Sequence, residues 1–331
     1  MKIAIMGTGG VGGYFGGLLA RAGNDVTFIA RGAHLQAIRQ NGLRVESLND
    51  GDFVVHGNAV QDTSQAGFQD LVLFTVKMYH NEDAIDAIRP LMGPSSVVLT
   101  LQNGIDNGEQ LVEAFGRERV LIGSCYMEGR IKEPGVVTQG GPGMASFGEL
   151  EPGITGRCQQ LLAVFQEANW RVELQENMPG MLWKKFSYLA GSAAVGAATR
   201  TLFGEMRAIP ETRAIIQGAI EEILEVGRAS GAPIMEDSLQ WCMTSLDNFP
   251  ATGMSSLGKD FLEGRPVELD GLTGTAIDMA RRYGVATPIN DTLYGILKPW
   301  ALAIERDLAR AGAGNTDPEP VVLGPKENFI D

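Results

Sequence analysis

The sequence predicts an α/β fold, with a doubly wound parallel sheet first and an all-helical domain after it. In the first half, short apolar segments typical of buried strands alternate with segments whose apolar residues recur at helical spacing. In the second half glycine turns become rare and long helical patterns dominate. We expect a sheet domain over residues 1–174, a helical domain over 175–312 and a polar, proline-rich tail over 313–331.

A first strand, which includes the apolar Ile3, Ile5 and Met6, runs directly into a glycine turn with the pattern G-x-G-x-x-G. The turn consists of Gly7, Thr8, Gly9, Gly10, Val11 and Gly12. In such a turn the first glycine permits a tight bend, the second lets the backbone approach a pyrophosphate, and the third allows close packing of helix on strand. A helical pattern follows to residue 22, and its free N–H groups and dipole attract phosphates. Strand, turn and helix together predict a Rossmann-type dinucleotide site; the alternative is an ordinary glycine-rich turn.

The second strand, residues 25–30, ends at Arg31. A site that prefers NAD usually places an acid near this point, about 20 residues after the motif, to bind the ribose hydroxyls. Here the next acid is Glu46. A guanidinium suits the 2′-phosphate of NADP, so the sequence predicts NADP; the alternative is a solvated arginine at a strand end.

Two further predicted strands deliver polar residues to the edge of the sheet where open α/β folds bind ligands. Residues 70–76 lead to Lys77, and residues 96–101 lead to Asn103. A solvated lysine and an Asn-Gly turn are the alternatives. The remaining predictions for this half are helices over 34–41 and 81–89, a hairpin of 43–47 with 53–55, and strands over 120–126 and 136–139.

In the second half we expect helices over 181–194, 211–230, 268–283 and 290–311, the last interrupted at Pro299. The second of these carries an apolar stripe of Ile215, Ala219, Ile220, Ile223 and Leu224. Lys184 and Lys185 lie in an otherwise apolar helix, so one of them can face inward while the other is solvated. Glu268 is expected to start a helix, where the dipole favours a carboxylate.

Composition narrows the classes of function. The net charge of -13 makes nucleic acid or an anionic membrane surface an improbable partner. The three cysteines lie far apart in the sequence, which suggests neither a disulfide framework nor a zinc site and fits a cytoplasmic protein. The three histidines do not group as metal ligands or as part of a triad, so no metal is expected.

An ordered set of motifs identifies a resemblance over nearly the whole chain. These motifs are GTGGVG with Arg31, the strand that ends at Lys77, QNG at 102–104, LWKK at 182–185, and SSLGKD at 255–260 running into VELD at 267–270. In this combination the chain resembles the ketopantoate reductase (2-dehydropantoate 2-reductase) family of pantothenate biosynthesis. The resemblance implies an NADP-dependent oxidoreductase that reduces a 2-oxo acid in a cleft between a Rossmann domain and a helical domain.

The resemblance also implies roles for individual residues. Lys185 would donate the proton at the ketone, and Glu268 would anchor the substrate and orient the lysine. Asn103 would help to hold substrate and nicotinamide, Ser256 would bind the substrate carboxylate, and Asp260 would support this group. Arg31 and Lys77 would contact the cofactor. A homodimer is compatible with the sequence.

One departure from the family concerns the substrate. Family members that act on ketopantoate usually carry asparagines four and eight residues after the catalytic lysine, where this chain has Leu189 and Ala193. Ketopantoate, with its terminal hydroxyl, is therefore expected to be a poorer substrate than a 2-oxo acid with an apolar tail, unless Ser187 or Ser192 supplies the hydrogen bond. A reductase of a different 2-oxo acid or imine, and a sensor that binds NADP without catalysis, are the alternatives; the presence of both Lys185 and Glu268 argues against the sensor.

Overall fold

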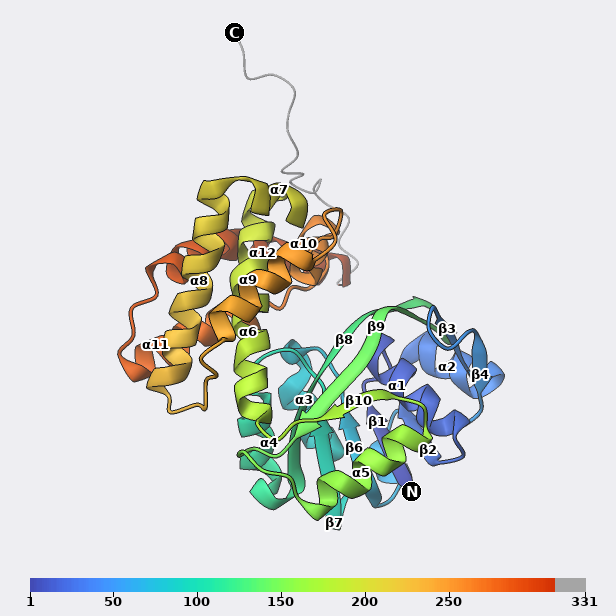
Figure 1. Ribbon diagram of the computed structural model, residues 1–331. Coiled ribbons are helices and arrows are strands. Elements are labelled where there is room, and N and C mark those ends of the chain that lie inside the picture. Colours follow the sequence, from blue (N-terminus) through green and yellow to red (C-terminus); the bar gives the residue numbers. More distant parts are fainter. Residues whose placement is uncertain (313–331) are drawn as a thin grey trace.

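The computed structural model describes residues 1–312, and the tail predicted over 313–331 lies outside them. A ten-stranded sheet with its covering helices occupies the chain up to Leu174, and helices follow from Met178 onward. Figure 1 shows the two parts side by side, with α6 (Met178–Thr199) running from the edge of the sheet into the helical part. The predicted fold class, a Rossmann sheet followed by helices, is confirmed.

The strand order of the sheet is β4-β3-β9-β8-β7-β6-β1-β2-β5, and β10 also pairs with β9. The strands are β1 (Lys2–Met6), β2 (Asp25–Ile29), β3 (Leu43–Ser47), β4 (Phe53–Val55), β5 (Asn58–Val60), β6 (Gln69–Phe74), β7 (Met92–Thr100), β8 (Val120–Glu133), β9 (Val136–Gly148) and β10 (Arg171–Leu174). Central β1 is parallel to both neighbours, β2 and β6. From β1 the chain adds β2 and β5 on one side of the sheet and then β6, β7 and β8 on the other, so the direction of winding reverses between β1 and β6. This reversal is where doubly wound sheets bind ligands.

The sheet is mixed rather than wholly parallel, because β8 and β9 form a long antiparallel hairpin. The sequence predicts much shorter strands here, over 120–126 and 136–139. Residues 129–133, in the outer part of β8, are exposed, so they carry no buried apolar pattern, and it is the cross-strand hydrogen bonding that extends them. The predicted hairpin of β3 with β4 is present and antiparallel.

Five α-helices accompany the sheet in the described chain: α1 (Gly10–Arg21), α2 (Gly32–Asn41), α3 (Asn81–Ile88), α4 (Asn107–Phe115) and α5 (Gly156–Glu167). Short 3₁₀ turns are η1 (Thr63–Gln65), η2 (Met78–His80), η3 (Arg89–Leu91) and η4 (Arg117–Arg119). α1 packs its buried Phe15 against Trp170, with ring centroids 4.4 Å apart, in the larger core of this part. The sequence patterns predict neither α4 nor α5.

The helical part contains α6, α7 (Phe203–Ala208), α8 (Pro210–Ala229), α9 (Ser238–Asn248), α10 (Ser256–Leu262), the π-helical turn η5 (Asp270–Gly274), α11 (Thr275–Tyr283) and α12 (Pro288–Gly312). In α8 the predicted stripe is correct except at one position: Ile215 is 43% exposed, and Ile216 is buried in its place. No helix within residues 1–312 is both long enough and apolar enough to cross a membrane.

Two predictions about helix boundaries are wrong. Pro299 does not interrupt α12, which is continuous through it. A proline frees the carbonyl four residues earlier, and both Pro299 and Gly295 are exposed, so water can bind that carbonyl. The helix predicted from residue 268 instead begins with η5, so Glu268 lies in the segment before it.

Candidate active site

The glycine turn has the geometry that a dinucleotide requires. Gly7 follows β1 with a φ of +99°, which favours glycine, and the buried Thr8 hydroxyl donates to the Ile29 carbonyl over 2.9 Å. A Cβ added at Gly9 would meet nothing within 4 Å, so the turn opens onto free space at the start of α1. A Cβ at Gly12 would lie 2.3 Å from the Gly7 carbonyl oxygen, so the helix packs directly against the turn.

The outer part of β8 also approaches this turn. A Cβ added at Gly10 would lie 2.1 Å from the carbonyl carbon of Gly129, so the two backbones are in direct contact. Val11 is half-buried and packs against the core. Arg31 is exposed and immediately precedes α2.

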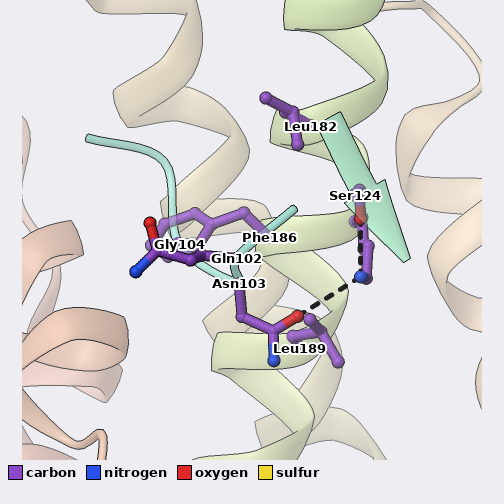
Figure 2. Close-up of a pocket in the computed structure, with 8 residues that line it drawn as sticks. Gln102, Asn103, Gly104, Ser124, Leu182, Phe186 and Leu189 are labelled. Atoms are coloured by element: carbon purple, nitrogen blue, oxygen red, sulfur yellow. Dashed lines mark hydrogen bonds between the residues drawn. The ribbon is translucent and has the colours of Figure 1, made fainter. Parts of the chain in front are cut away.

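Lys185, on α6, is the central group of the site. Its side chain is 5% exposed, and Nζ donates to Ser124 Oγ at 2.6 Å, to the Cys125 carbonyl at 2.6 Å and to Asn103 Oδ1 at 3.3 Å. Nζ also lies 4.6 Å from the centre of the Tyr126 ring. Figure 2 shows Asn103 and Ser124 converging on one narrow recess, with the apolar Leu182, Phe186 and Leu189 around it.

The two adjacent lysines are in different environments. Burial lowers the pKa of Lys185 below its usual value, because the charged form loses solvation. Lys184 points away from the recess: its Nζ lies 3.6 Å from Asp237 and 5.3 Å from the centre of the Trp241 ring. Of the two lysines, Lys185 is the one that faces the recess. The prediction that the other is solvated is wrong, because the Lys184 side chain is only 12% exposed and packs against Trp241.

A second group of charges joins the sheet to the helical part. Lys77 Nζ lies 2.7 Å from Glu268 Oε2 and 3.9 Å from Asp260, and the backbone N–H of Met78 donates to Glu268 Oε1 over 3.1 Å. Burial opposes the charge on Lys77, but the two carboxylates outweigh it and raise the pKa of the lysine. Glu268 is only 8% exposed, whereas the Lys77 side chain is 47% exposed, so the carboxylate is buried and the ammonium is partly solvated.

The two groups are neighbours but share no hydrogen bond in the described residues. Met78 connects them, because a Cβ added at Gly104, next to Asn103, would lie 2.5 Å from the Met78 sulfur. Both Glu268 oxygens bond to the Lys77–Met78 segment and not to Lys185. Ser256 is exposed at the first position of α10, one turn before Asp260.

The sequence patterns miss three residues around Lys185, namely Ser124, Cys125 and Tyr126. Ser124 is fully buried in β8, and serine in a strand gives no signal of function. Cys125 contributes its backbone carbonyl, which no residue pattern can indicate. Only the pairing of the sheet and its approach to α6 bring these groups to the lysine.

Neither serine of α6 is available to a ligand. Ser187 Oγ donates to the Trp183 carbonyl over 2.8 Å, and Ser192 Oγ donates to the Tyr188 carbonyl over 2.5 Å. Both side chains are buried. Each hydroxyl is thus used by its own helix, as is common for serine within helices.

Comparison with known proteins agrees with this geometry. Residues 3–152 match the family description "Ketopantoate reductase PanE/ApbA", and residues 177–301 match "Ketopantoate reductase PanE/ApbA C terminal". A 2-dehydropantoate 2-reductase from Pyrococcus horikoshii is 30% identical over 300 residues, which cover 90% of this chain and 97% of that protein. A homologue of the same name from Nostoc is 29% identical over 305 residues, covering 90% of this chain and 94% of that protein.

Solved structures give the same result. A PanE/ApbA family ketopantoate reductase from Ralstonia eutropha superposes with a TM-score of 0.84 at 32% identity, covering 92% of this chain and 100% of that one. A 2-dehydropantoate 2-reductase from Geobacter metallireducens superposes with a TM-score of 0.83 at 31% identity, covering 90% and 99%. Sequence, fold and the buried lysine therefore agree, and the chain belongs to the ketopantoate reductase family.

Proposed function

We propose that this nicotinamide-dependent oxidoreductase uses NADPH to reduce a 2-oxo acid, with Lys185 as the proton donor and 2-dehydropantoate as the substrate to test first. The observation that carries the proposal is the environment of Lys185. A buried ammonium that faces a recess, with its pKa lowered by burial, is a better acid than an exposed lysine. The names of the relatives supply the substrate class.

The glycine turn fits a dinucleotide. Free space above Gly9 and the N–H groups at the start of α1 would accept the pyrophosphate. The exposed Arg31 would bind the 2′-phosphate, which is the contact that distinguishes NADP from NAD. Lys77 lies at the same edge of the sheet, where its ammonium would be shared between Glu268 and the cofactor.

When bound, the nicotinamide supplies the hydride that attacks the carbonyl carbon of the substrate. Lys185 would protonate the oxygen as negative charge develops on it. Since Nζ already donates to three acceptors, the substrate oxygen must replace one of them, and the 3.3 Å bond to Asn103 is the longest of the three. Ser124 and the Cys125 carbonyl would keep the ammonium in place during the exchange.

The remaining residues would hold the substrate. Asn103, once released from Lys185, can donate through its amide to the substrate or the nicotinamide. The exposed Ser256 hydroxyl would bind the carboxylate, and Asp260, on the same helix, would hold α10 against Lys77. Glu268 would bind the distal end of the substrate; any effect on Lys185 would pass through the Lys77–Met78 segment rather than a direct bond.

The test is the consumption of NADPH, followed at its absorbance band, with a panel of 2-oxo acids that includes 2-dehydropantoate. Turnover with at least one of them, faster with NADPH than with NADH, is the expected result. Tight NADPH binding without turnover of any of these acids would contradict the proposal and favour a sensor of NADP. An analytical ultracentrifugation run on the same sample would test the homodimer.

A further inference from the structure

His34 joins three segments around the glycine turn. The ring lies on α2, three residues after Arg31, and is half-buried. Its Nε2 lies 2.8 Å from the carbonyl oxygen of Thr8 in the glycine turn. Its Nδ1 lies 3.0 Å from the backbone nitrogen of Gly135, in the short connection between β8 and β9.

These two contacts fix the protonation state of the ring. The backbone N–H of Gly135 can only donate, so Nδ1 must be the unprotonated acceptor. The Thr8 carbonyl can only accept, so Nε2 must carry the proton. The ring is therefore a neutral imidazole of one tautomer. A second proton, on Nδ1, would point at the backbone N–H of Gly135, so two donors would face each other and the hydrogen bond to the hairpin would be lost.

The segments that the ring joins are those that shape the cofactor site. Thr8 is part of the glycine turn, and Arg31 precedes the helix that carries His34. The hairpin that ends at Gly135 packs its Gly129 directly on Gly10. Gly135 itself has a φ of +82° and leaves room for α2: a Cβ there would lie 2.9 Å from Ala37. Loss of the Gly135 bond would remove the hydrogen bond that joins the hairpin tip to α2 and, through the ring, to the glycine turn.

We propose that His34 is a positioning residue of the cofactor site, which holds the glycine turn, the Arg31 helix and the β8–β9 hairpin together only while its ring is neutral. This rests on the proposed function, in that the cofactor phosphates bind at the glycine turn. Cofactor affinity should then fall when the ring gains a proton, although His34 touches neither substrate nor the reacting atoms.

The charges nearby do not oppose this behaviour. The glycine turn carries no charged side chain. The charged residues close in sequence to the ring and to Gly135 are Arg31, Arg39, Arg130, Lys132 and Glu133. Arg44, on β3, lies beside Gly135 and donates to its carbonyl through its backbone N–H, while its side chain pairs with Asp52 and Glu46. Lys132 pairs with Glu46 at 2.7 Å, and Arg39 donates to the Ala59 carbonyl over 2.8 Å. Burial lowers the pKa of His34 below its usual 6.5, with the Thr8 bond acting against it, so the ring is neutral at pH 7 and gains its proton only at a pH below 6.5.

The test is the dissociation constant of NADP⁺, which is stable in acid, measured by calorimetry between pH 5 and 8 on the full chain. His34→Gln keeps a donor toward Thr8, His34→Asn keeps an acceptor for Gly135, and His34→Ala keeps neither. The matched control is His56→Gln, because His56 is exposed. Titration of the 2′-phosphate near pH 6 also affects binding, but it is common to all the proteins, so the differences between them report on His34.

At pH 8 we expect His34→Ala to raise the dissociation constant by roughly 5- to 50-fold, and each single-bond variant by roughly 2- to 10-fold. The KM for NADPH should rise in parallel, while kcat at saturating NADPH stays within about twofold, since no reacting group is removed. As the pH falls, the wild type and His56→Gln should lose more affinity for NADP⁺ than titration of the 2′-phosphate accounts for. His34→Gln and His34→Ala should lack this additional loss.

Identical acid dependence in the wild type and His34→Gln, or unchanged affinity in His34→Ala at pH 8, would overturn the proposal and leave the proposed function intact. A wild type that binds no NADP⁺ at any pH would instead overturn the proposed function. If His34→Ala does not fold, as judged by its melting curve, the comparison of His34→Gln with the wild type still decides the matter.

Discussion

Replacement of Lys185 by alanine tests the proposed mechanism most directly. The substitution removes an ammonium whose three hydrogen bonds, to Asn103, Ser124 and the Cys125 carbonyl, hold it at the recess. A positioned general acid contributes roughly 10²- to 10⁴-fold to a rate, so kcat should fall by that factor. This corresponds to about 2.7–5.5 kcal/mol of transition-state stabilisation. NADPH affinity should survive, because the glycine turn and Arg31 lie on other elements.

The pH dependence of the wild type provides a second measure of the same lysine. A general acid must carry its proton, so activity should be lost as the pH rises through the pKa of Lys185. Because burial lowers this pKa below 10.5, the loss should begin at a lower pH than an exposed lysine would allow. Lys185→Ala should lack this alkaline limb.

The adjacent lysine is the matched control. Lys184 lies in the same turn of α6 but faces Asp237 and Trp241, so Lys184→Ala should leave kcat almost unchanged. Steady-state kinetics and fluorescence titration of NADPH measure all three proteins, and melting temperatures show whether each is folded. A damaging Lys184→Ala together with a mild Lys185→Ala would refute the reasoning, since the inward-facing lysine would then have been assigned wrongly.

Three further predictions concern the cofactor, the support of the lysine and the substrate. Arg31→Ala should weaken NADPH binding by on the order of 1.5–3 kcal/mol and NADH binding little; equal losses for both cofactors in a binding titration would show that Arg31 does not touch the 2′-phosphate. Ser124→Ala removes one 2.6 Å bond to the buried lysine and should lower kcat roughly 10-fold without changing NADPH affinity, whereas an unaltered kcat and pH profile would exclude a role for this serine. Leu189 lines the recess, and Ala193 is buried four residues farther along the helix. Neither side chain has a hydrogen-bonding group, and a buried substrate hydroxyl left unpaired costs about 1–3 kcal/mol. The analogue of ketopantoate without its hydroxyl should therefore show the higher kcat/KM, and a clear preference for ketopantoate would contradict this.

Local sequence patterns predict much of the structure of the sheet part. The glycine turn depends on backbone space and on a positive φ at Gly7, which only a few residue types permit, so the pattern alone locates it. The order of short apolar strands and helical segments likewise predicts the doubly wound sheet, because period and length of apolar runs are local properties. The inward orientation of one of two adjacent lysines also follows from helical geometry.

Other features were decided by contacts between distant segments. The outer part of β8, residues 129–133, is exposed and lacks a buried apolar pattern, so its length comes from pairing with β9 rather than from its own residues. The helix continues through Pro299, where both Pro299 and Gly295 are exposed and water can bind the carbonyl that the proline leaves unpaired; this exposure cannot be predicted from one residue. Periodicity also does not separate a π-helical turn from an α-helix over five residues, which is why the sequence pattern predicts a helix from residue 268 where the structure has η5 from Asp270.

The same distinction holds in the site. The sequence by itself determined the residue types, namely the glycine turn, Arg31 and the lysine of LWKK, together with the family that carries them in this order. Only the tertiary structure decided the partners: Ser124 and the Cys125 carbonyl at Lys185, Lys77 at Glu268, and the use of Ser187 and Ser192 by their own helix. The physical reason is that hydrogen bonds and burial depend on distances between atoms that lie far apart in the chain, and these distances are set by how the sheet and α6 pack.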